Sequence, residues 1–458
     1  MTVSRDLVRG LMRMSARPIP DEVLTAAKLH LLDAIGVGLA ASRTAIGEPY
    51  RNAAPDLCGT GGASVFGLDL SGSAAGAALI NGGLIHSLEF DDTHTASIVH
   101  GSSLVACVAL AVAQEAGADG RSVLGAFVRG WEAFIRIGLA APGAFQAQGF
   151  QITAVGGAPI AALIAGELMD LDEDQRVNAI GISLSQASGV FEFLTNGSSV
   201  KSLHPGWAAH AGIVAAILAR AGMTGPETAI EGRFGLFRRF ANDEGAADRL
   251  RDLIGELGST WRVPEAAFKL RPCCHYLHPF IEAALDLRAR GATVASAAQV
   301  ECRVPAGAAP LICEPWNEKQ RASGHPARWS LPIVVAAALA DGNVSLDTFE
   351  AAPSRDVMAL AQRITWQPLA GARFPERFEA EITLTTQDGT IHEARVDDVY
   401  GNASRPARED DVMAKFRANA RRAVTADGAA QLEKTILAVE YEPSLGAMAA
   451  ALRMLAPQ

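Results

Sequence analysis

The sequence predicts a mainly α protein, in which a large all-helical domain carries an inserted, smaller α+β domain. Alanine-rich segments with apolar residues at helical spacing fill residues 1–265. Strand-like alternation begins after Pro264, and helical patterns return near Asp410. We therefore expect an all-helical domain of residues 1–265 plus 399–458 and an α+β domain of residues 266–398.

Helices are expected throughout the first domain. The segment Asp21 to Ala41 places Val23, Ala27 and Leu31 at helical spacing, and Pro20 suits the helix entry. Because alanine dominates and the segments are apolar on most of their circumference, we expect most of them to be buried in a bundle. Further helices are expected at residues 73–89, 102–116, 121–138, 154–168, 173–188, 206–221 and 245–256.

Strand patterns define the inserted domain. Gln299 to Val304 and Phe378 to Thr386 alternate apolar and polar residues, as half-buried strands do. Asp388-Gly389 then predicts a hairpin turn into a strand from Thr390 to Val396. Helices are expected at 277–289 and 330–340 in this domain, and at 410–423 and 429–439 after it.

Length, charge and cysteine content limit the kind of protein this can be and the partners it can bind. A chain of 458 residues, 49% hydrophobic, is long enough for two domains or more. Its formal net charge of −10 argues against binding to nucleic acid or to an anionic membrane. Charged residues such as Arg5 and Arg9 argue against a secretory signal, and the least polar run, 154–166, is too short to span a bilayer. With six cysteines in so long a chain, we expect a reducing, cytoplasmic location.

The stretch from His86 to Ser103 carries the strongest chemical signal. It reads HSLEFDDTHTASIVHGSS and overlaps the end of an apolar, Ala/Gly-rich segment. Carboxylates and imidazoles at the end of a buried helix are costly to desolvate unless they are paired or used, which favours a catalytic site. Two other interpretations stay open: a helix end with solvated acids and a capping histidine, or a metal site, although the spacing matches no specific metal motif.

Two further segments concentrate positive charge. Lys201 lies just ahead of an expected helix start near Pro205, where an ammonium beside free backbone N–H groups would bind a carboxylate. Lys269 and Arg271 stand where the chain enters the second domain, and they suit a di- or tricarboxylate. In both segments the basic residues would also fit a solvated surface. The adjacent Cys273-Cys274 pair and the lack of any C-x-x-C motif argue against an iron–sulfur cluster.

These motifs, in this order, resemble the MmgE/PrpD family, and the resemblance runs from Leu31 to Arg417. Known members include cofactor-free 2-methylcitrate dehydratases, cis-aconitate decarboxylases and iminodisuccinate epimerases. The resemblance implies an all-helical lyase domain, an inserted α+β domain, a cleft between them and a homodimer. It also implies that neither a cofactor nor a metal is needed.

The resemblance also assigns roles to residues. His100 corresponds to the family's catalytic histidine. Asp91 or Asp92 is expected to orient it, and Lys201 or Lys269 is expected to supply the second acid or base. The expected substrate contacts are Asp92, Thr93, His94, Gln151, His204, Arg271 and His278.

At two positions the sequence departs from the family pattern. Gln151 stands where many relatives have a histidine, and it can form hydrogen bonds but cannot carry a proton. Ile333 stands where the pattern has a tyrosine. Both departures argue against methylcitrate dehydration in particular.

The sequence therefore predicts a cofactor-independent lyase that removes a proton α to a carboxylate of a small di- or tricarboxylic acid and eliminates water. An epimerase of a substituted succinate is the main rival, because it needs the carbanion step but no leaving group. Decarboxylation at the same site is a further variant. A catalytically silent dimer that keeps the fold is the alternative from another class.

Overall fold

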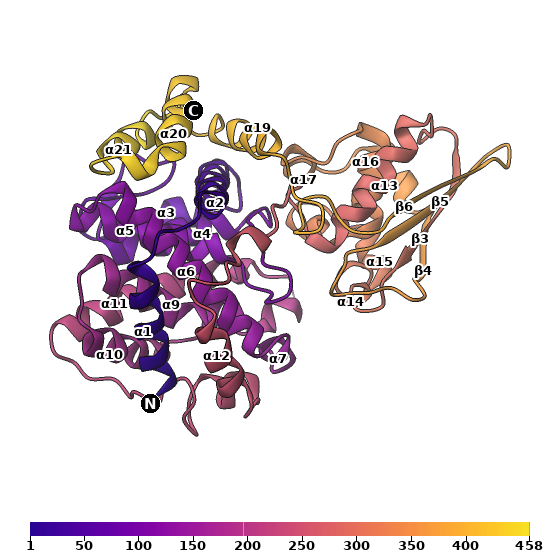
Figure 1. Ribbon diagram of the computed structural model, residues 1–458. Helices are drawn as coiled ribbons and strands as arrows, with labels where there is room; N and C mark the ends of the chain where they lie inside the picture. Colours follow the sequence, from indigo (N-terminus) through magenta and orange to yellow (C-terminus); the bar gives the residue numbers. More distant parts are fainter. Residues whose placement is uncertain (196, 458) are drawn as a thin grey trace. The chain divides into compact units, whose positions relative to one another are not determined.

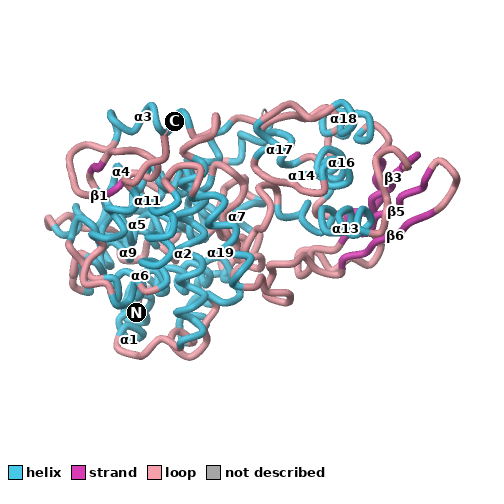
Figure 2. Tube along the Cα trace, turned by 90° about the horizontal axis from the view of Figure 1, so that it is seen from above, coloured by secondary structure: helices cyan, strands magenta, loops and turns pink. Residues whose placement is uncertain are grey.

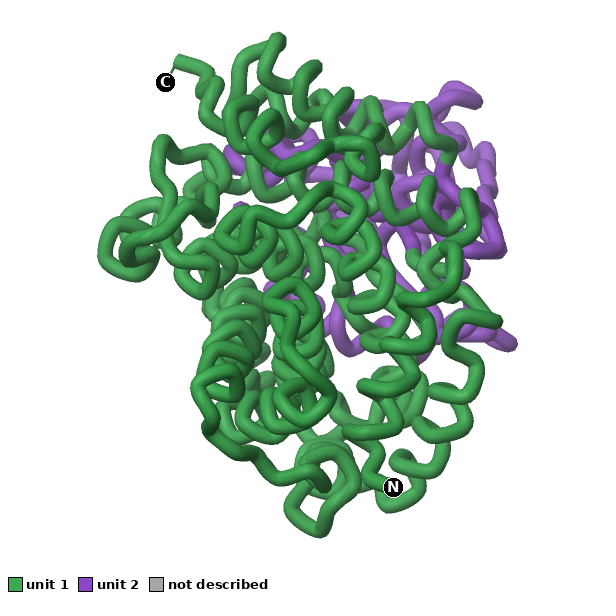
Figure 3. The backbone as a smooth tube through the Cα atoms, turned by 60° about the vertical axis from the view of Figure 1, so that its left-hand side comes forward, with its two compact units in different colours: residues 1–266, 408–458 green, residues 267–407 purple. Residues whose placement is uncertain are grey.

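The computed structural model describes residues 1–195 and 197–457, and within them the chain is mainly α, as the sequence predicts. The chain forms two compact units. Unit 1 comprises residues 1–266 and 408–458, and unit 2 comprises residues 267–407 (Figure 3).

Unit 1 is built mainly from helices (Figure 1), and it also carries a two-stranded ribbon of β1 (Ala63–Ser64) and β2 (Ser71–Gly72), of which Figure 2 labels β1. Its α-helices are α1 (Val3–Ser15), α2 (Asp21–Ala41), α3 (Glu48–Leu57), α4 (Ala74–His86), α5 (Gly101–Ala116), α6 (Gly120–Ala140), α7 (Ala144–Ala147), α8 (Ile152–Val155), α9 (Gly157–Leu168), α10 (Glu173–Leu184), α11 (Leu203–Arg220), α12 (Ala246–Gly255), α19 (Glu409–Ala420), α20 (Ala426–Leu437) and α21 (Gly446–Leu452).

Helices α4 and α11 cross at close range. A Cβ on Gly206 would lie 2.2 Å from the Leu79 carbonyl oxygen, and a Cβ on Gly82 would lie 2.8 Å from the Gly206 Cα. Only glycine lets the two backbones approach this closely. The crossing brings the last turn of α4, which ends at His86, beside the first turn of α11, which contains His204.

Helix α2 is long and apolar enough, by length and composition alone, to cross a membrane, and 78% of its most apolar window is buried inside the protein. It packs against α4, α5, α6, α19 and α20 and so serves as a core helix of unit 1. The sequence predicts this helix over the same residues, Asp21 to Ala41, and the structure confirms it, with Lys28, His30 and Asp33 within its span.

The last segment of the chain belongs to unit 1 because α19 packs along α2. The Nζ of Lys415 on α19 lies 2.7 Å from a carboxylate oxygen of Asp33 on α2. Both side chains are buried, and the same Nζ donates to the backbone carbonyl of Phe90 at 2.8 Å. A buried ion pair thus joins the first and last parts of unit 1, and its lysine contacts the loop that follows α4.

Unit 2 contains a four-stranded sheet in the order β4-β3-β5-β6 (Figure 1). Strand β3 (Ala297–Val304) pairs antiparallel with β5 (Ala380–Thr386), and β5 pairs antiparallel with β6 (Ile391–Val396). Strand β4 (Ile364–Pro368) pairs parallel with β3. The predicted alternation and hairpin are confirmed, whereas β4, an edge strand with mostly polar or exposed residues, was not predicted.

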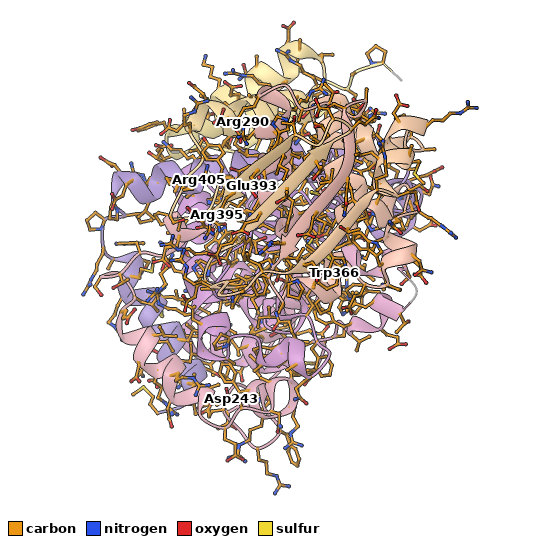
Figure 4. The ribbon with its side chains drawn as sticks, turned by 90° about the vertical axis from the view of Figure 1, so that its right-hand side faces the viewer. Asp243, Arg290, Trp366, Glu393, Arg395 and Arg405 are labelled. Atoms are coloured by element: carbon orange, nitrogen blue, oxygen red, sulfur yellow. The ribbon has the colours of Figure 1, made fainter. Side chains whose placement is uncertain are left out.

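One face of this sheet is covered by helices, of which α13 and α16 lie nearest to the strands. Burial alternates strictly along β5, so the covered side carries residues such as Ile382 and Leu384. The other side carries polar pairs, including Arg395 of β6 with Glu381 at 2.6 Å, and Figure 4 shows Arg395 and Glu393 on this sheet. The helices are α13 (His278–Ala289), α14 (Ala309–Ile312), α15 (Trp316–Lys319), α16 (Leu331–Asp341), α17 (Asp347–Glu350) and α18 (Arg355–Ala361).

Candidate active site

The loop between α4 and α5, residues 87–100, holds the predicted acidic and imidazole side chains. It is almost wholly buried, and a bridge between His94 and Val99 closes its second half. Glu89 adopts a left-handed backbone with φ of 52°, which is unfavourable for a residue with a side chain. The loop is therefore held in a specific conformation by its buried contacts.

Asp91 lies between two imidazoles. Its Oδ2 atom is 2.8 Å from Nδ1 of His86 and 3.1 Å from Nδ1 of His100. The carboxylate is fully buried, whereas the His100 side chain keeps 13% of its surface exposed. The backbone N–H of His100 donates to Oγ1 of Thr153 at 3.1 Å, which fixes the start of α5. The structure thus places a buried carboxylate at one ring nitrogen of His100 and leaves a small part of this side chain exposed.

The charge of Asp91 depends on these imidazoles. Burial alone would raise the pKa of the Asp91 carboxyl, but the positive charge and hydrogen bonds available from His86 and His100 hold this pKa well below its ordinary value. Asp91 is therefore ionised at neutral pH. An ionised carboxylate at this distance stabilises a positively charged imidazole and so favours a histidine that accepts and returns a proton.

Asp92, next in the chain, points the other way and anchors the loop to the bundle. Its Oδ2 is 2.7 Å from Nδ1 of His30, and its Oδ1 accepts the backbone N–H of Ser102 at 3.0 Å. The hydroxyl of Ser102 also donates to Oδ2 at 2.5 Å and in turn accepts the indole N–H of Trp131 at 3.1 Å. Through these contacts Asp92 holds the loop in place. Its expected contact with substrate stays a prediction.

Thr93 and His94 complete the loop. Oγ1 of Thr93 lies 3.4 Å from Nδ1 of His100, on the same side as Asp91. His94 accepts the backbone N–H of Ser97 on Nδ1 at 3.2 Å, so its other nitrogen carries the proton and donates to Glu265 at 3.2 Å. Both ring nitrogens of His94 are thus engaged in hydrogen bonds, whereas Thr93 lies next to His100, the candidate catalytic histidine.

Gln151 joins this loop to α11. Its Nε2 atom is 3.2 Å from Nε2 of His86, and its Oε1 atom is 2.5 Å from Nδ1 of His204. Burial, together with the nearby positive charge of Lys201, lowers the pKa of His204 to about 4. His204 is therefore neutral at neutral pH, and the two predicted residues Gln151 and His204 lie in contact with the Asp91 cluster.

Lys201 lies in a short 3₁₀ helix, Ser199–Ser202, immediately before α11, where the sequence predicts it. Its ammonium forms an ion pair with Glu89, and the side chains keep 16% and 5% of their surfaces exposed. The neighbouring Ser202 is held by the hydroxyl of Tyr50 at 2.7 Å. A lysine charge therefore lies at the helix start and within electrostatic range of His204.

Three predicted residues belong to unit 2, and Lys269 is buried there. Arg271 donates to the Leu270 carbonyl at 3.1 Å, and burial lowers the pKa of its guanidinium. His278 begins α13 and meets His275 edge to face, with ring centroids 4.9 Å apart. Ile333 is buried in the core of unit 2. The predicted roles of Lys269, Arg271 and His278 toward substrate stay predictions.

Comparison with known proteins gives the family. The model of the MmgE/PrpD N-terminal domain matches residues 5–248, and that of the C-terminal domain matches residues 272–441. The chain belongs to the MmgE/PrpD family. This MmgE/PrpD protein is 28% identical to a cis-aconitate decarboxylase-like protein of Aspergillus oryzae over 96% of this chain and 94% of the relative.

Two further relatives carry the name cis-aconitate decarboxylase. The human protein is 27% identical, over 92% of this chain and 88% of the relative. The Aspergillus terreus protein is 29% identical, over 63% of this chain and 60% of the relative. Membership of the family and the enzymatic names of these relatives support an enzyme with a lyase-type function.

The same imidazole cluster offers donors to a metal ion. His86, Asp91 and His100 each turn one donor atom toward the others, and these atoms lie within 4.8 Å of one another. Imidazole and carboxylate donors suit zinc and related ions. Because hydrogen bonds from Nδ1 now join the same atoms, an ion would have to replace both imidazole protons. The expectation that this MmgE/PrpD protein needs no metal stays a prediction.

Sequence reasoning missed two parts of the site. His86 was recognised as the start of the polar stretch but received no role, although it lies five residues before Asp91 and shares its carboxylate. Lys415, more than 300 residues away along the chain, supports the loop through Phe90 and Asp33. No local pattern identifies Lys415, because its position depends on how α19 packs on α2.

Proposed function

We propose that this protein is a cofactor-independent lyase that transfers a proton at the carbon next to a carboxylate of a small di- or tricarboxylic acid. The observation that carries the proposal is the His100–Asp91 pair. A fully buried carboxylate lies 3.1 Å from Nδ1 of an imidazole whose side chain keeps 13% of its surface exposed. That arrangement suits a general acid or base at neutral pH.

The chemistry follows from the donor and acceptor atoms. Since Asp91 is ionised, it accepts the proton on Nδ1 of His100, which leaves Nε2 to take or give the proton of the reaction. A proton taken up on Nε2 creates an imidazolium that Asp91 stabilises directly. Lys201 supplies a positive charge that would hold a substrate carboxylate near the start of α11.

Decarboxylation is the reaction we favour, because relatives matching 92–96% of this chain are named for it. In such a reaction the carbon–carbon bond to one carboxylate breaks and CO₂ leaves. The released electron pair shifts to a neighbouring carbon, which takes a proton from the imidazolium of His100. The site then regains that proton from water.

Water elimination, which the sequence alone favours, is the second candidate. It needs a base for the carbon proton and an acid for the departing hydroxyl. The ion pair of Lys201 with Glu89 supplies a second group that can donate a proton, beside the His100–Asp91 pair. This second proton donor is the observation that supports dehydration as an alternative reaction.

The test is NMR of the purified, full-length protein in D₂O with EDTA present. The substrates are cis-aconitate, citrate, 2-methylcitrate and iminodisuccinate, each supplied separately. We expect CO₂ release from cis-aconitate with one deuteron placed on carbon for each CO₂ formed. Gain or loss of water on a citrate-type acid would replace decarboxylation by dehydration. Exchange without loss of any group would point to an epimerase, and no change in any acid would contradict the proposal.

A further inference from the structure

Five side chains form one hydrogen-bonded series through unit 1. His100 and His86 both approach Oδ2 of Asp91, at 3.1 and 2.8 Å. His86 continues to Gln151 at 3.2 Å, and Gln151 continues to His204 at 2.5 Å. Asp91 lies in the loop between α4 and α5. The other members stand at the last residue of α4, directly before α5 and α8, and in the first turn of α11, so the series links four helices of unit 1.

The protons in this series can be assigned from the chemistry of each group. An ionised carboxylate only accepts, so Nδ1 of His86 and Nδ1 of His100 must both carry protons. The amide nitrogen of Gln151 only donates, so Nε2 of His86 must be an unprotonated acceptor. The amide oxygen only accepts, which places the proton of the neutral His204 on its Nδ1 atom.

The reversed orientation of the Gln151 amide would have a different consequence. Its oxygen would then face Nε2 of His86, which would need a second proton and a full positive charge. The His86 side chain is 0% exposed, and its ring centroid lies 4.6 Å from that of His100. Asp91, 2.8 Å away, would offset part of the cost of burying this imidazolium, but the second imidazole becomes charged during turnover and the two positive charges would repel. The orientation with a neutral His86 avoids both costs.

We infer that Gln151 and His86 are positioning residues for the catalytic dyad, the pair of His100 and Asp91. Gln151 keeps His86 neutral with its proton on Nδ1, and His86 uses this N–H to donate a lasting hydrogen bond to Asp91. The second hydrogen bond on Oδ2 fixes the carboxylate and makes it a weaker proton acceptor. A proton that arrives on His100 therefore stays on His100, where it can be passed to carbon. The catalytic effect of this arrangement rests on the proposed function, whereas the positions of the protons do not.

An amide is well suited to this part. It offers a donor on one side and an acceptor on the other at every accessible pH, whereas an imidazole changes its pattern when it titrates. Gln151 therefore does not compete for the transferred proton, and it fixes the tautomers of two histidines at once. The inference changes the predicted role of Gln151 from a contact with substrate to support for the dyad.

The test reads the tautomers directly and without substrate. Full-length protein with ¹⁵N-labelled histidine is studied by long-range ¹H–¹⁵N NMR at neutral pH, and the His86 signals are assigned by their loss in His86→Gln. We expect His86 to be protonated on Nδ1 and unprotonated on Nε2. In Gln151→Glu, whose carboxylate accepts from Nε2, we expect both nitrogens to be protonated. His210→Gln serves as control, because His210 instead contacts the Ala75 carbonyl.

A wild-type His86 protonated on both nitrogens, or on Nε2 alone, would overturn the inference. So would an unchanged His86 signal in a folded Gln151→Glu variant. Because this readout needs no turnover, it stands even if the proposed reaction is wrong.

Kinetics then separate support from substrate contact. We expect Gln151→Leu to lower kcat by about 10- to 100-fold with little change in KM, as loss of an outer partner of a functional histidine does. A rise in KM with unchanged kcat would mean instead that Gln151 binds substrate, and it would overturn the positioning role.

Discussion

Asp91 is the residue through which His100 acquires its proposed chemistry, because it accepts the Nδ1 proton and stabilises the charged ring. Replacing Asp91 with Asn keeps the size of the side chain but removes the charge, and the amide can turn a donor toward Nδ1. We expect Asp91→Asn to lower kcat by about 10²- to 10⁴-fold, which is the factor that general acid–base catalysis usually contributes to the rate. Steady-state kinetics on the acid that wild type converts measures this.

The matched control for Asp91 is Asp119, an exposed carboxylate that caps α6 by accepting the backbone N–H of Ser122 at 2.8 Å. Asp119→Asn should leave the rate essentially unchanged. Equal rates for Asp91→Asn and wild type, in a variant that remains folded, would show that the carboxylate takes no part in turnover.

At the scale of elements, the crossing of α4 and α11 places His86, His204 and Lys201 in one cluster. A Cβ at position 206 would meet the Leu79 carbonyl oxygen at 2.2 Å, and backbone on both sides leaves no flexible atom to yield. We expect Gly206→Ala to lower the free energy of unfolding by about 1–3 kcal/mol, the usual cost of overpacking, and to reduce activity as the helices separate. Chemical denaturation and kinetics measure the two effects.

The control for this substitution is Gly255→Ala at the end of α12, where an added Cβ meets nothing within 4 Å. We expect no loss of stability there, since alanine is the better helix former. If Gly206→Ala were as stable and as active as Gly255→Ala, the close crossing would not be required for the site.

Elements that depend on local pattern could be predicted from the sequence. The alternation along Phe378 to Thr386 and the Asp388-Gly389 turn predict β5 and its hairpin with β6, and the structure has both. Strand β4 could not be predicted, because its pairing with β3 is a long-range parallel contact and its own residues are mostly polar or exposed. Local pattern therefore identifies the hairpin but not the edge strand that completes the sheet.

The same distinction holds in the site. The loop motif identified Asp91 and His100 as neighbours in the chain, and the structure joins them. It could not identify the contact of Gln151 with His86 or that of Lys415 with Phe90, because each brings together residues far apart in the sequence. Family resemblance directed attention to Gln151 as a departure from the usual histidine and as an expected substrate contact, not as a partner of His86.

At the scale of the whole molecule, the Asp33–Lys415 ion pair joins the first and last segments of unit 1. Burial raises the pKa of Asp33 to about 6 against the pull of Lys415, and burial lowers the pKa of Lys415. We expect Lys415→Met to lower the free energy of unfolding by about 3–5 kcal/mol, because it leaves a buried carboxylate unpaired. Removing both charges with Asp33→Asn and Lys415→Met should restore much of that stability.

Denaturant titrations of the two single variants and the double variant form a complete cycle. A double variant no more stable than Lys415→Met alone would contradict the coupling of these two groups.

The pH dependence of stability tests the neutral His204. Its pKa falls from 6.5 in the unfolded chain to about 4 in the folded protein, so the unfolded state takes up a proton first as pH falls. The contribution of His204 to stability is complete above pH 6.5 and is lost as pH falls toward 4. Between about pH 7.5 and about pH 5 this amounts to about 2 kcal/mol.

Asp33 acts in the opposite direction, since its raised pKa stabilises the folded form as pH falls below about 6. Comparing wild type with His204→Gln at both pH values cancels the part that Asp33 contributes. We expect wild type to lose more stability than the variant on acidification, measured by denaturation at each pH. An equal loss would show that His204 is not held neutral by the fold.

Transfer of solvent deuterium to carbon, compared between wild type and His100→Gln by NMR in D₂O with the acid that wild type converts, decides whether His100 is the catalytic acid or base. We expect His100→Gln to stay folded and to transfer deuterium about 10²- to 10⁴-fold more slowly than wild type. A folded His100→Gln variant that transfers deuterium at the wild-type rate would contradict that role.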